Sequence, residues 1–238
     1  MYTDEVFSAL CEDEVEDIIR ALYESTLCDT VGRNSDREHV LQESTACDSK
    51  GRDFMNPVKN IAIMGQSGSG KSTLVNAIRG LHNDEEENAA KTGVVETTME
   101  PTAYPHPTLR NLIFWDFPGT GTPNCITQSI NYHQYDLFII IASERVRHSD
   151  MELAKNIWSM KKKLYFVRNK IDTDLRASKV RRWKTYDEQR ILHEIQDNCI
   201  RGLSDCGIDE PRVFLLSCLE LDKYDFHLLM MTLEKEQY

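Results

Sequence analysis

The pattern of hydrophobic and polar residues divides the chain into two parts that meet near residue 57. Between residues 6 and 27 hydrophobic side chains recur mostly three to five positions apart, which predicts an amphipathic helix with an acidic outer face. Residues 29–56 show no sustained period and are rich in Ser, Asp, Asn, Arg and Thr, as is typical of a mobile linker. We therefore expect a partly helical or disordered N-terminal segment at 1–56 and a folded domain at 57–238.

From residue 58 onward strands and helices alternate. Short apolar runs predict strands at 58–64, 112–115, 137–142, 164–168 and 213–216. Helical periodicity predicts helices at 70–80, 150–160, 179–200 and 222–236. The run at 137–142 is apolar at every position, as in a strand that is covered on both faces. The pattern predicts an α/β fold with three layers (α/β/α) and a mostly parallel sheet, preceded by the short acidic helical segment.

The composition is that of an ordinary soluble globular protein, with 40% hydrophobic and 28% charged residues. The longest apolar run is far shorter than the roughly 20 residues that a membrane-spanning helix needs. The N-terminus has neither a basic leader nor an apolar stretch, and Tyr2 stands where N-myristoylation requires Gly. Seven scattered cysteines without a Cys-x-x-Cys pair argue against zinc and disulfide frameworks. These features predict a cytoplasmic protein.

The net charge of −11 is unevenly distributed. Residues 1–56 hold 14 acidic and 5 basic side chains, a balance of −9, and the remaining residues have a balance of −2. A nucleic-acid-binding protein would show a basic patch, so no nucleic-acid partner is expected. Basic runs at 161–163 and 181–184 are typical of solvated helix ends, and contact with acidic lipid or a partner is the alternative.

Residues 65–72 read Gly-Gln-Ser-Gly-Ser-Gly-Lys-Ser, which fits the phosphate-loop pattern G-x-x-x-x-G-K-[ST] between a predicted strand and a predicted helix. Glycines let backbone N–H groups wrap around phosphates, and the helix N-terminus adds positive potential. Lys71 is expected to reach the β- and γ-phosphates and the Ser72 hydroxyl to bind Mg²⁺. The alternative is a chance match in a flexible Gly/Ser loop, and the strand–loop–helix context disfavours it. The predicted nucleotide ligands here are Gly65, Gln66, Ser67, Gly68, Ser69, Gly70, Lys71, Ser72 and Thr73.

Asp116-Phe-Pro-Gly119 directly follows the predicted strand at 112–115. A carboxylate at a strand end that faces the phosphate loop can hold Mg²⁺ or its water, and the N–H of Gly119 can donate to a γ-phosphate. By itself this four-residue pattern is equally typical of a turn. Its place after a phosphate loop and at a strand end favours a nucleotide-sensing switch.

A second polar motif, Asn169-Lys170-Ile171-Asp172, follows the predicted strand at 164–168. The Asp172 carboxylate can accept hydrogen bonds from N1–H and the exocyclic amine of guanine, a donor pair that adenine lacks. The stem of Lys170 can cover the base plane. A solvated polar loop is the alternative, and the order of the three motifs disfavours it. Ser217 and Cys218 follow the last predicted strand, where a backbone N–H would meet guanine O6.

The residues between the phosphate loop and Asp116 carry a family resemblance. Residues 92–100 read Thr-Gly-Val-Val-Glu-Thr-Thr-Met-Glu, 104–107 read Tyr-Pro-His-Pro, and 114–122 read Phe-Trp-Asp-Phe-Pro-Gly-Thr-Gly-Thr. Over about residues 57–238 the chain resembles the immunity-related GTPases, an interferon-inducible, dynamin-like family. Because it has Lys71, the chain resembles the subgroup whose phosphate loop ends in Gly-Lys-Ser rather than Gly-Met-Ser.

The resemblance implies a G domain that hydrolyses GTP to GDP with Mg²⁺ and dimerises, with itself or with related GTPases, across its nucleotide face. It implies that Glu96 helps to activate hydrolysis and that Thr92 and Thr98 lie in the first switch, with Thr98 a candidate Mg²⁺ ligand. The catalytic set so predicted is Lys71, Glu96 and Thr98, and the metal set is Ser72, Thr98 and Asp116. The family acts in cell-autonomous innate immune defence on intracellular and pathogen-containing vacuole membranes.

The sequence also departs from that family. Family members continue into a helical domain after the G domain, and Asn169 stands where many of them have Thr. Thr120 occupies the position at which small GTPases carry the Gln that orients the attacking water. We therefore expect a GTPase that is slow alone and only weakly membrane-associated. The alternative is a non-catalytic module that binds GTP or GDP and regulates full-length relatives.

Overall fold

The computed structural model describes residues 57–81, 88–93, 98, 100–120 and 130–236. The chain divides into two compact units, Met1–Arg52 and Asp53–Tyr238, and the first of them lies wholly outside the described residues. The helix expected at 6–27 and the linker expected at 29–56 therefore fall outside the described residues. The boundary expected between 56 and 57 stays a prediction.

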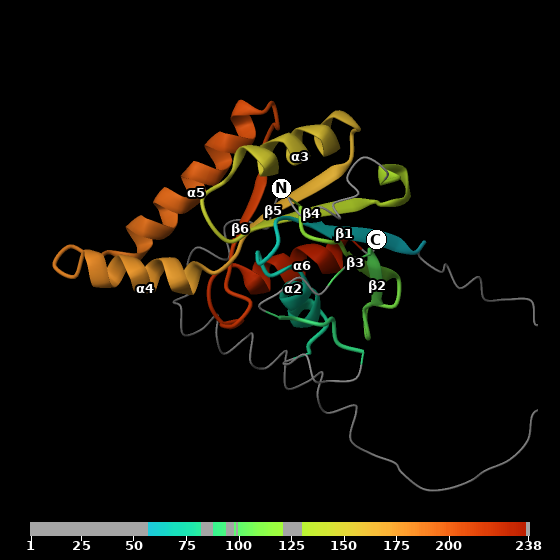
Figure 1. The fold of residues 1–238 in the computed structure, drawn as a ribbon, viewed down its shortest axis with the longest axis horizontal. Coiled ribbons are helices and arrows are strands. Elements are labelled where there is room, and N and C mark those ends of the chain that lie inside the picture. Colours follow the sequence, from blue (N-terminus) through green and yellow to red (C-terminus); the bar gives the residue numbers. More distant parts are fainter. Residues whose placement is uncertain (1–56, 82–87, 94–97, 99, 121–129, 237–238) are drawn as a thin grey trace, which may run out of the picture. The chain divides into compact units, whose positions relative to one another are not determined.

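The second unit is built on one six-stranded sheet with the strand order β2-β3-β1-β4-β5-β6 (Figure 1). Its strands are β1 (Lys59–Met64), β2 (Thr102–Pro105), β3 (Leu112–Asp116), β4 (Leu137–Ala142), β5 (Lys163–Arg168) and β6 (Arg212–Leu215). All neighbouring strands pair in parallel except β2, which pairs antiparallel with β3 at one edge. The mostly parallel sheet is confirmed.

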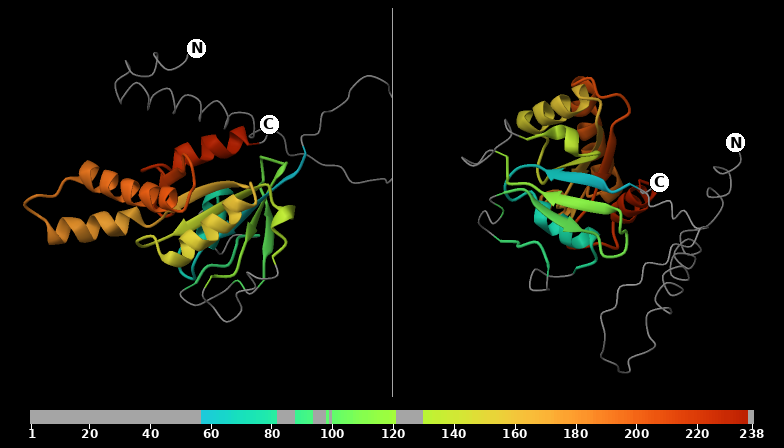
Figure 2. Two further views of the ribbon diagram at one scale, coloured as in Figure 1. Left: turned by 90° about the horizontal axis from the view of Figure 1, so that it is seen from above. Right: turned by 90° about the vertical axis from the view of Figure 1, so that its right-hand side faces the viewer.

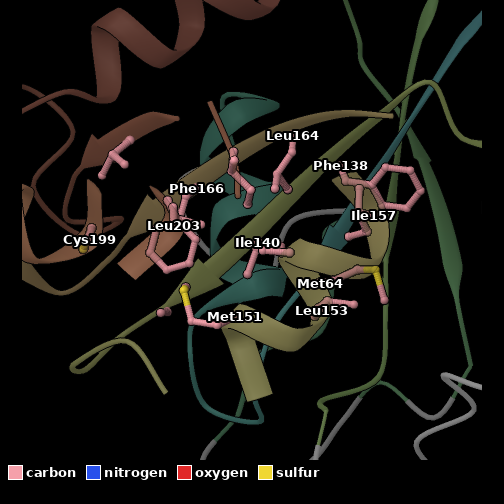
Figure 3. Close-up of a cluster of buried hydrophobic side chains, with 14 of the residues drawn as sticks. Met64, Phe138, Ile140, Met151, Leu153, Ile157, Leu164, Phe166, Cys199 and Leu203 are labelled. Atoms are coloured by element: carbon pink, nitrogen blue, oxygen red, sulfur yellow. The ribbon is translucent and has the colours of Figure 1, made fainter. Parts of the chain in front are cut away.

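Helices cover both faces of the sheet (Figures 1 and 2). They are α2 (Lys71–Ile78), α3 (His148–Ser159), α4 (Ile171–Arg181), α5 (Glu188–Asp205) and α6 (Phe226–Lys235), with a 3₁₀ turn, η1, at Tyr132–Gln134. One buried cluster joins the sheet to α3 and α5 through side chains such as Ile157 and Leu203 (Figure 3). The other joins it to α2 and α6 through side chains such as Leu74 and Leu229. The three-layer α/β/α architecture is thereby confirmed.

The central strand β4 shows why its sequence is apolar at every position. Phe138 and Ile140 belong to the cluster beneath α3 and α5, whereas Ile139 and Ile141 belong to the cluster beneath α2 and α6. All six residues of β4 are buried. Burying apolar area on both faces stabilises the sheet by roughly 1.5–3 kcal/mol for each large side chain.

Two elements differ from the predictions. The single helix expected at 179–200 is wrong, because α4 ends at Arg181 and α5 begins at Glu188. The break has a local cause, since the side chain of Asp187 accepts a hydrogen bond from the N–H of Arg190 and so caps a new helix. Strand β2 was missed because its four residues are mostly exposed and include a proline, so no hydrophobic alternation marks it.

Among the described residues, no helix combines the length and the apolar character that crossing a membrane requires.

Candidate functional site

The sequence motifs meet at one edge of the sheet because parallel strands end on the same side. The phosphate loop follows β1, Asp116 ends β3, the Asn169 motif follows β5, and Ser217 lies just beyond β6. Motifs that lie up to about 150 residues apart in the sequence therefore share one surface. Sheet topology alone is sufficient to bring them together.

Two glycines let the loops at this edge approach one another closely. Gly70 has φ of 99°, and a Cβ there would lie 2.4 Å from Nδ2 of Asn169. A Cβ on Gly119 would lie 2.6 Å from the backbone nitrogen of Ser67. A side chain at position 70 would collide with the Asn169 amide, and one at position 119 would collide with the backbone of Ser67, so both approaches depend on glycine. The phosphate loop is thus held against both the Asp116 turn and the Asn169 loop.

Lys71 lies at the N-terminus of α2 with its side chain folded back over the phosphate loop. Its Nζ donates to the backbone oxygen of Gln66 at 2.9 Å, and the residue is 7% exposed. The N–H of Ser69 donates to the same oxygen at 3.2 Å. A buried ammonium beside a helix N-terminus creates positive potential inside the loop, which favours a bound polyphosphate. The hydroxyl of Ser69 is buried and lacks a partner among the described residues.

Two of the three predicted metal ligands, Ser72 and Thr98, bind the carboxylate of the third, Asp116. The hydroxyls of Ser72 and Thr98 donate to Oδ2 of Asp116 at 2.6 and 3.0 Å, and the two hydroxyl oxygens lie 3.5 Å apart. Oδ1 of Asp116 is buried and has no hydrogen-bond partner among the described residues. Burial raises the pKa of this carboxyl, and the Ser72 hydroxyl and the Lys71 ammonium oppose that rise.

This donor set fits a hard divalent cation. It offers two hydroxyl oxygens and one carboxylate, which suits Mg²⁺ completed by water and phosphate oxygens. The described residues contain no group of three or more His, Cys, Asp or Glu that could hold a metal. A cation held here would need the hydroxyls and further oxygen ligands in addition to Asp116. The unpartnered Oδ1 is the observation that a bound cation would explain.

Asn169 ties the guanine motif to the phosphate loop. Its Nδ2 donates to the backbone oxygen of Ser69 at 2.9 Å, and its Oδ1 accepts from the N–H of Cys218 at 3.1 Å. The side chain is almost fully buried. Lys170 makes a parallel contact, because its Nζ donates to the backbone oxygen of Gly68 at 2.9 Å. The structure thus brings Asn169 and Lys170 to the phosphate loop.

The remaining residues predicted to contact the base lie nearby, and they differ in the hydrogen bonds that they already make within the protein. Asp172 stands in the first turn of α4, half-buried, and one carboxylate oxygen accepts from the Thr173 hydroxyl at 3.2 Å. The N–H of Cys218 is bonded to Asn169, so a contact with guanine O6 would have to share or replace that bond. The Ser217 hydroxyl accepts from the N–H of Leu219 at 3.3 Å. Burial raises the pKa of the Cys218 thiol to about 12, so it remains neutral.

Several predicted ligands occupy other places. The Gln66 side chain donates to the Ser149 hydroxyl at 3.0 Å and so points toward α3, leaving its backbone for the loop. Thr73 lies in the first turn of α2. Glu96, predicted to be catalytic, lies outside the described residues. The N–H of Thr120 donates to the backbone oxygen of Gly65 at 3.0 Å.

Two features of the site were not found from the sequence. Arg168 is buried and donates to the backbone oxygen of Asn169 at 2.8 Å and to the Asp174 carboxylate at 2.5 Å, which fixes the start of α4. A pocket of about 260 Å³ opens between the phosphate loop and the segment after β4. Its lining mixes basic and acidic side chains, namely Arg145, Arg147, Lys170, Glu144 and Asp150. An arginine at the end of a strand, such as Arg168, carries no local signal of such a role.

A phosphate loop between β1 and α2, an aspartate at the end of β3 and an Asn-Lys-x-Asp motif after β5 define a P-loop GTPase domain. The Interferon-inducible GTPase (IIGP) family model matches residues 29–238. The chain is 43% identical over 183 residues to Interferon-inducible GTPase 1 of Mus musculus, covering 75% of this chain and 44% of the mouse protein. It is also 43% identical over 180 residues to Interferon-inducible GTPase 5 of Bos taurus, covering 74% of this chain and 38% of that protein.

The chain therefore belongs to the interferon-inducible GTPase family, as the resemblance predicted. It spans less than half the length of these two relatives. Solved structures agree on the fold. Era of Aquifex aeolicus bound to GDP and AlF4⁻ superposes with a TM-score of 0.52 at 21% identity, covering 75% of this chain and 56% of that one. A bacterial selenocysteine-specific elongation factor superposes with a TM-score of 0.50 at 17% identity, covering 75% and 28%.

Proposed function

We propose that this chain binds GTP with Mg²⁺ and hydrolyses it to GDP and phosphate. The observation that carries the proposal is the convergence of Ser72 and Thr98 on Asp116, beside the buried Lys71 ammonium. A buried carboxylate with one free oxygen next to a cationic loop supports a site for a metal–phosphate complex. The family name of the relatives points in the same direction.

In this proposal each group of residues has a separate task. The backbone N–H groups of the phosphate loop and the Lys71 ammonium bind the β- and γ-phosphates and stabilise the charge that develops between them. Ser72, Thr98 and Asp116 would hold Mg²⁺, which neutralises phosphate charge when it is bound. The N–H of Gly119 would donate to the γ-phosphate, so the position of the segment that follows Gly119 would depend on whether that phosphate is bound.

Guanine selectivity is assigned to the loop after β5. Asp172 would pair with the two donors on the guanine edge, and the αL conformation of Lys170 lays its side chain along the phosphate loop, with Nζ on the backbone oxygen of Gly68. Asn169 has a positioning role, because both ends of its amide are occupied by the protein. The loop that would bind the base is therefore already hydrogen-bonded to the phosphate loop.

The proposed catalytic step needs a second G domain. Thr120 has no side-chain amide with which to align an attacking water, so one domain lacks the usual device of small GTPases. We assign that task to Glu96, brought into place when two copies, or a copy and a related GTPase, meet through the nucleotide face. Arg145 lines the pocket beside the phosphate loop and brings a positive charge next to the nucleotide site, whereas Arg147 in the same lining is paired with Glu144 at 2.6 Å.

The biological setting is proposed from the relatives. Relatives of this chain are named as interferon-inducible and immunity-related GTPases, which supports a role in cell-autonomous innate immune defence. It would work in the cytoplasm and associate weakly with intracellular or pathogen-containing vacuole membranes.

Single-turnover GTP hydrolysis over a range of protein concentrations tests the mechanism. Specific activity should rise with concentration, because the active site is completed by a second copy. Glu96→Ala should keep GTP binding and lose most turnover, whereas Lys71→Ala should lose both. A concentration-independent rate would refute the dimer mechanism. GTP binding without turnover at any concentration would instead favour the non-catalytic regulatory module.

A further inference from the structure

The segment that joins α4 to α5 exposes two large hydrophobic side chains that belong to neither buried cluster. We call residues 176–186, which include the last six residues of α4, the α4–α5 turn. Within it Trp183 is 74% exposed and Val180 is 77% exposed. Figure 1 and the left view of Figure 2 both show the ends of α4 and α5 reaching away from the sheet. An exposed tryptophan three positions from an exposed valine is unusual for a solvated helix end.

The same turn carries a local excess of positive charge. It contains five basic and no acidic residues in a chain whose net charge is −11. All five basic residues are exposed, and within the described part of the chain none forms an ion pair with a carboxylate. They are Arg176, Lys179, Arg181, Arg182 and Lys184.

Aromatic rings lie among these cations. The Lys184 ammonium is 5.0 Å from the centre of the Trp183 ring, and the Lys179 ammonium is 5.8 Å from the centre of the Tyr186 ring. Such an arrangement combines an amphipathic ring with charged groups on flexible stems. It matches the interface of a membrane, where tryptophan sits at the headgroup level and lysine and arginine reach the phosphates.

We propose that the α4–α5 turn docks on the surface of an anionic lipid membrane. Trp183 and Val180 enter the interfacial layer, and the five basic side chains bind lipid phosphates and carboxylates. This inference rests on the proposed membrane association and assigns it a surface and a lipid charge. Charge complementarity selects the anionic lipid, and the exposed apolar pair selects a membrane over a purely acidic polypeptide. The acidic residues elsewhere in the chain repel an anionic membrane only over about a Debye length, roughly 8 Å at physiological ionic strength.

Docking at this turn leaves the nucleotide site accessible. Helix α4 begins at Ile171, directly after the Asn169–Lys170 pair, and the turn includes its C-terminal half. The eleven residues of α4 place Arg182 and Trp183 about 16 Å from that pair, whereas Arg176 lies about halfway along the helix. The Arg168–Asp174 ion pair anchors the beginning of α4 to β5, so α4 holds the turn at a fixed distance from the site.

Vesicle flotation of the full 238-residue chain tests the proposal. Phosphatidylcholine vesicles with and without phosphatidylserine are compared at low and high salt. Binding should require phosphatidylserine and be released by high salt, and Trp183 emission should shift to the blue, a signal that Trp183→Phe removes. The Arg181→Gln/Arg182→Gln variant should partition roughly thirtyfold more weakly, as expected for two lost surface cations. Trp183→Ala should also weaken binding.

The matched control is Arg190→Gln/Arg201→Gln on α5, which removes the same charge from exposed positions outside the turn. It should retain most vesicle binding. No binding to anionic vesicles at low salt, an equal loss in both double variants, or stronger capture by polyglutamate than by vesicles would each overturn the proposal. GTP hydrolysis in solution is measured on the same samples, so a failure of vesicle binding is distinguishable from a failure of the GTPase proposal.

Discussion

Asn169→Ala should destabilise the domain far more than its size suggests. The Asn169 side chain is the partner of two buried backbone groups, the oxygen of Ser69 and the N–H of Cys218. Leaving a buried donor or acceptor unpaired costs about 1–3 kcal/mol for each group. The expected loss is therefore about 3 kcal/mol of unfolding free energy, out of the roughly 5–15 kcal/mol typical of a domain.

Asn169→Asp separates the two bonds. A carboxylate can still accept from the N–H of Cys218, but it faces the Ser69 oxygen without a proton to donate, and its charge would be nearly fully buried. We expect a loss at least as large as that of Asn169→Ala, whereas a purely steric role for Asn169 would leave the aspartate variant close to the parent.

Urea denaturation followed by circular dichroism measures the change, with the m-value checked for constancy. The matched control is Asn198→Ala, at an exposed position of α5, which should change stability by less than about 0.5 kcal/mol. Titration with a fluorescent GDP analogue should show weaker binding for Asn169→Ala, because the phosphate loop loses its tie to the base loop. A stability change below about 0.5 kcal/mol for Asn169→Ala would refute the reasoning.

Two further predictions concern the ligands. Asp172→Asn should weaken GTP binding by about 2–3 kcal/mol and improve binding of xanthosine triphosphate, whose carbonyl complements the amide, as measured by competitive titration. Equal affinity of the parent for ATP and GTP would contradict this assignment. Asp116→Asn removes a buried charge whose pKa is raised by burial, so without Mg²⁺ the fold should be equally stable or more stable by about 1 kcal/mol. The same variant should lose the extra thermal stabilisation that Mg²⁺ gives the GTP complex of the parent, and a melting scan with and without Mg²⁺ decides both points.

The sequence predicts those parts of the molecule whose cause is local. Glycine and lysine spacing at 65–72 specifies a phosphate loop, because backbone geometry and a helix N-terminus are properties of neighbouring residues. The fully apolar run of β4 likewise specifies a strand covered on both faces. The order of the three motifs, each after a strand, is sufficient to place them on one edge of the sheet.

Parts of the molecule that depend on distant contacts were not predictable in the same way. The bond between Asn169 and Ser69 joins residues 100 positions apart, so no local pattern announces it. The α4–α5 break was missed because hydrophobic periodicity outweighed the capping signal of Asp187. Arg168 ends an otherwise apolar strand, and its burial beside Asp174 becomes evident only when α4 packs against β5.

The strand order also determines when the nucleotide site can form during synthesis. β1, which carries the phosphate loop, pairs with β3 on one side and β4 on the other, so it lacks a complete set of partners until residue 142 has left the ribosome. The base loop acquires its Cys218 contact only after β6 has been made. Parallel pairing over such sequence separations is slow, because long loops must close first. The nucleotide site is therefore complete only when nearly the whole domain has been synthesised.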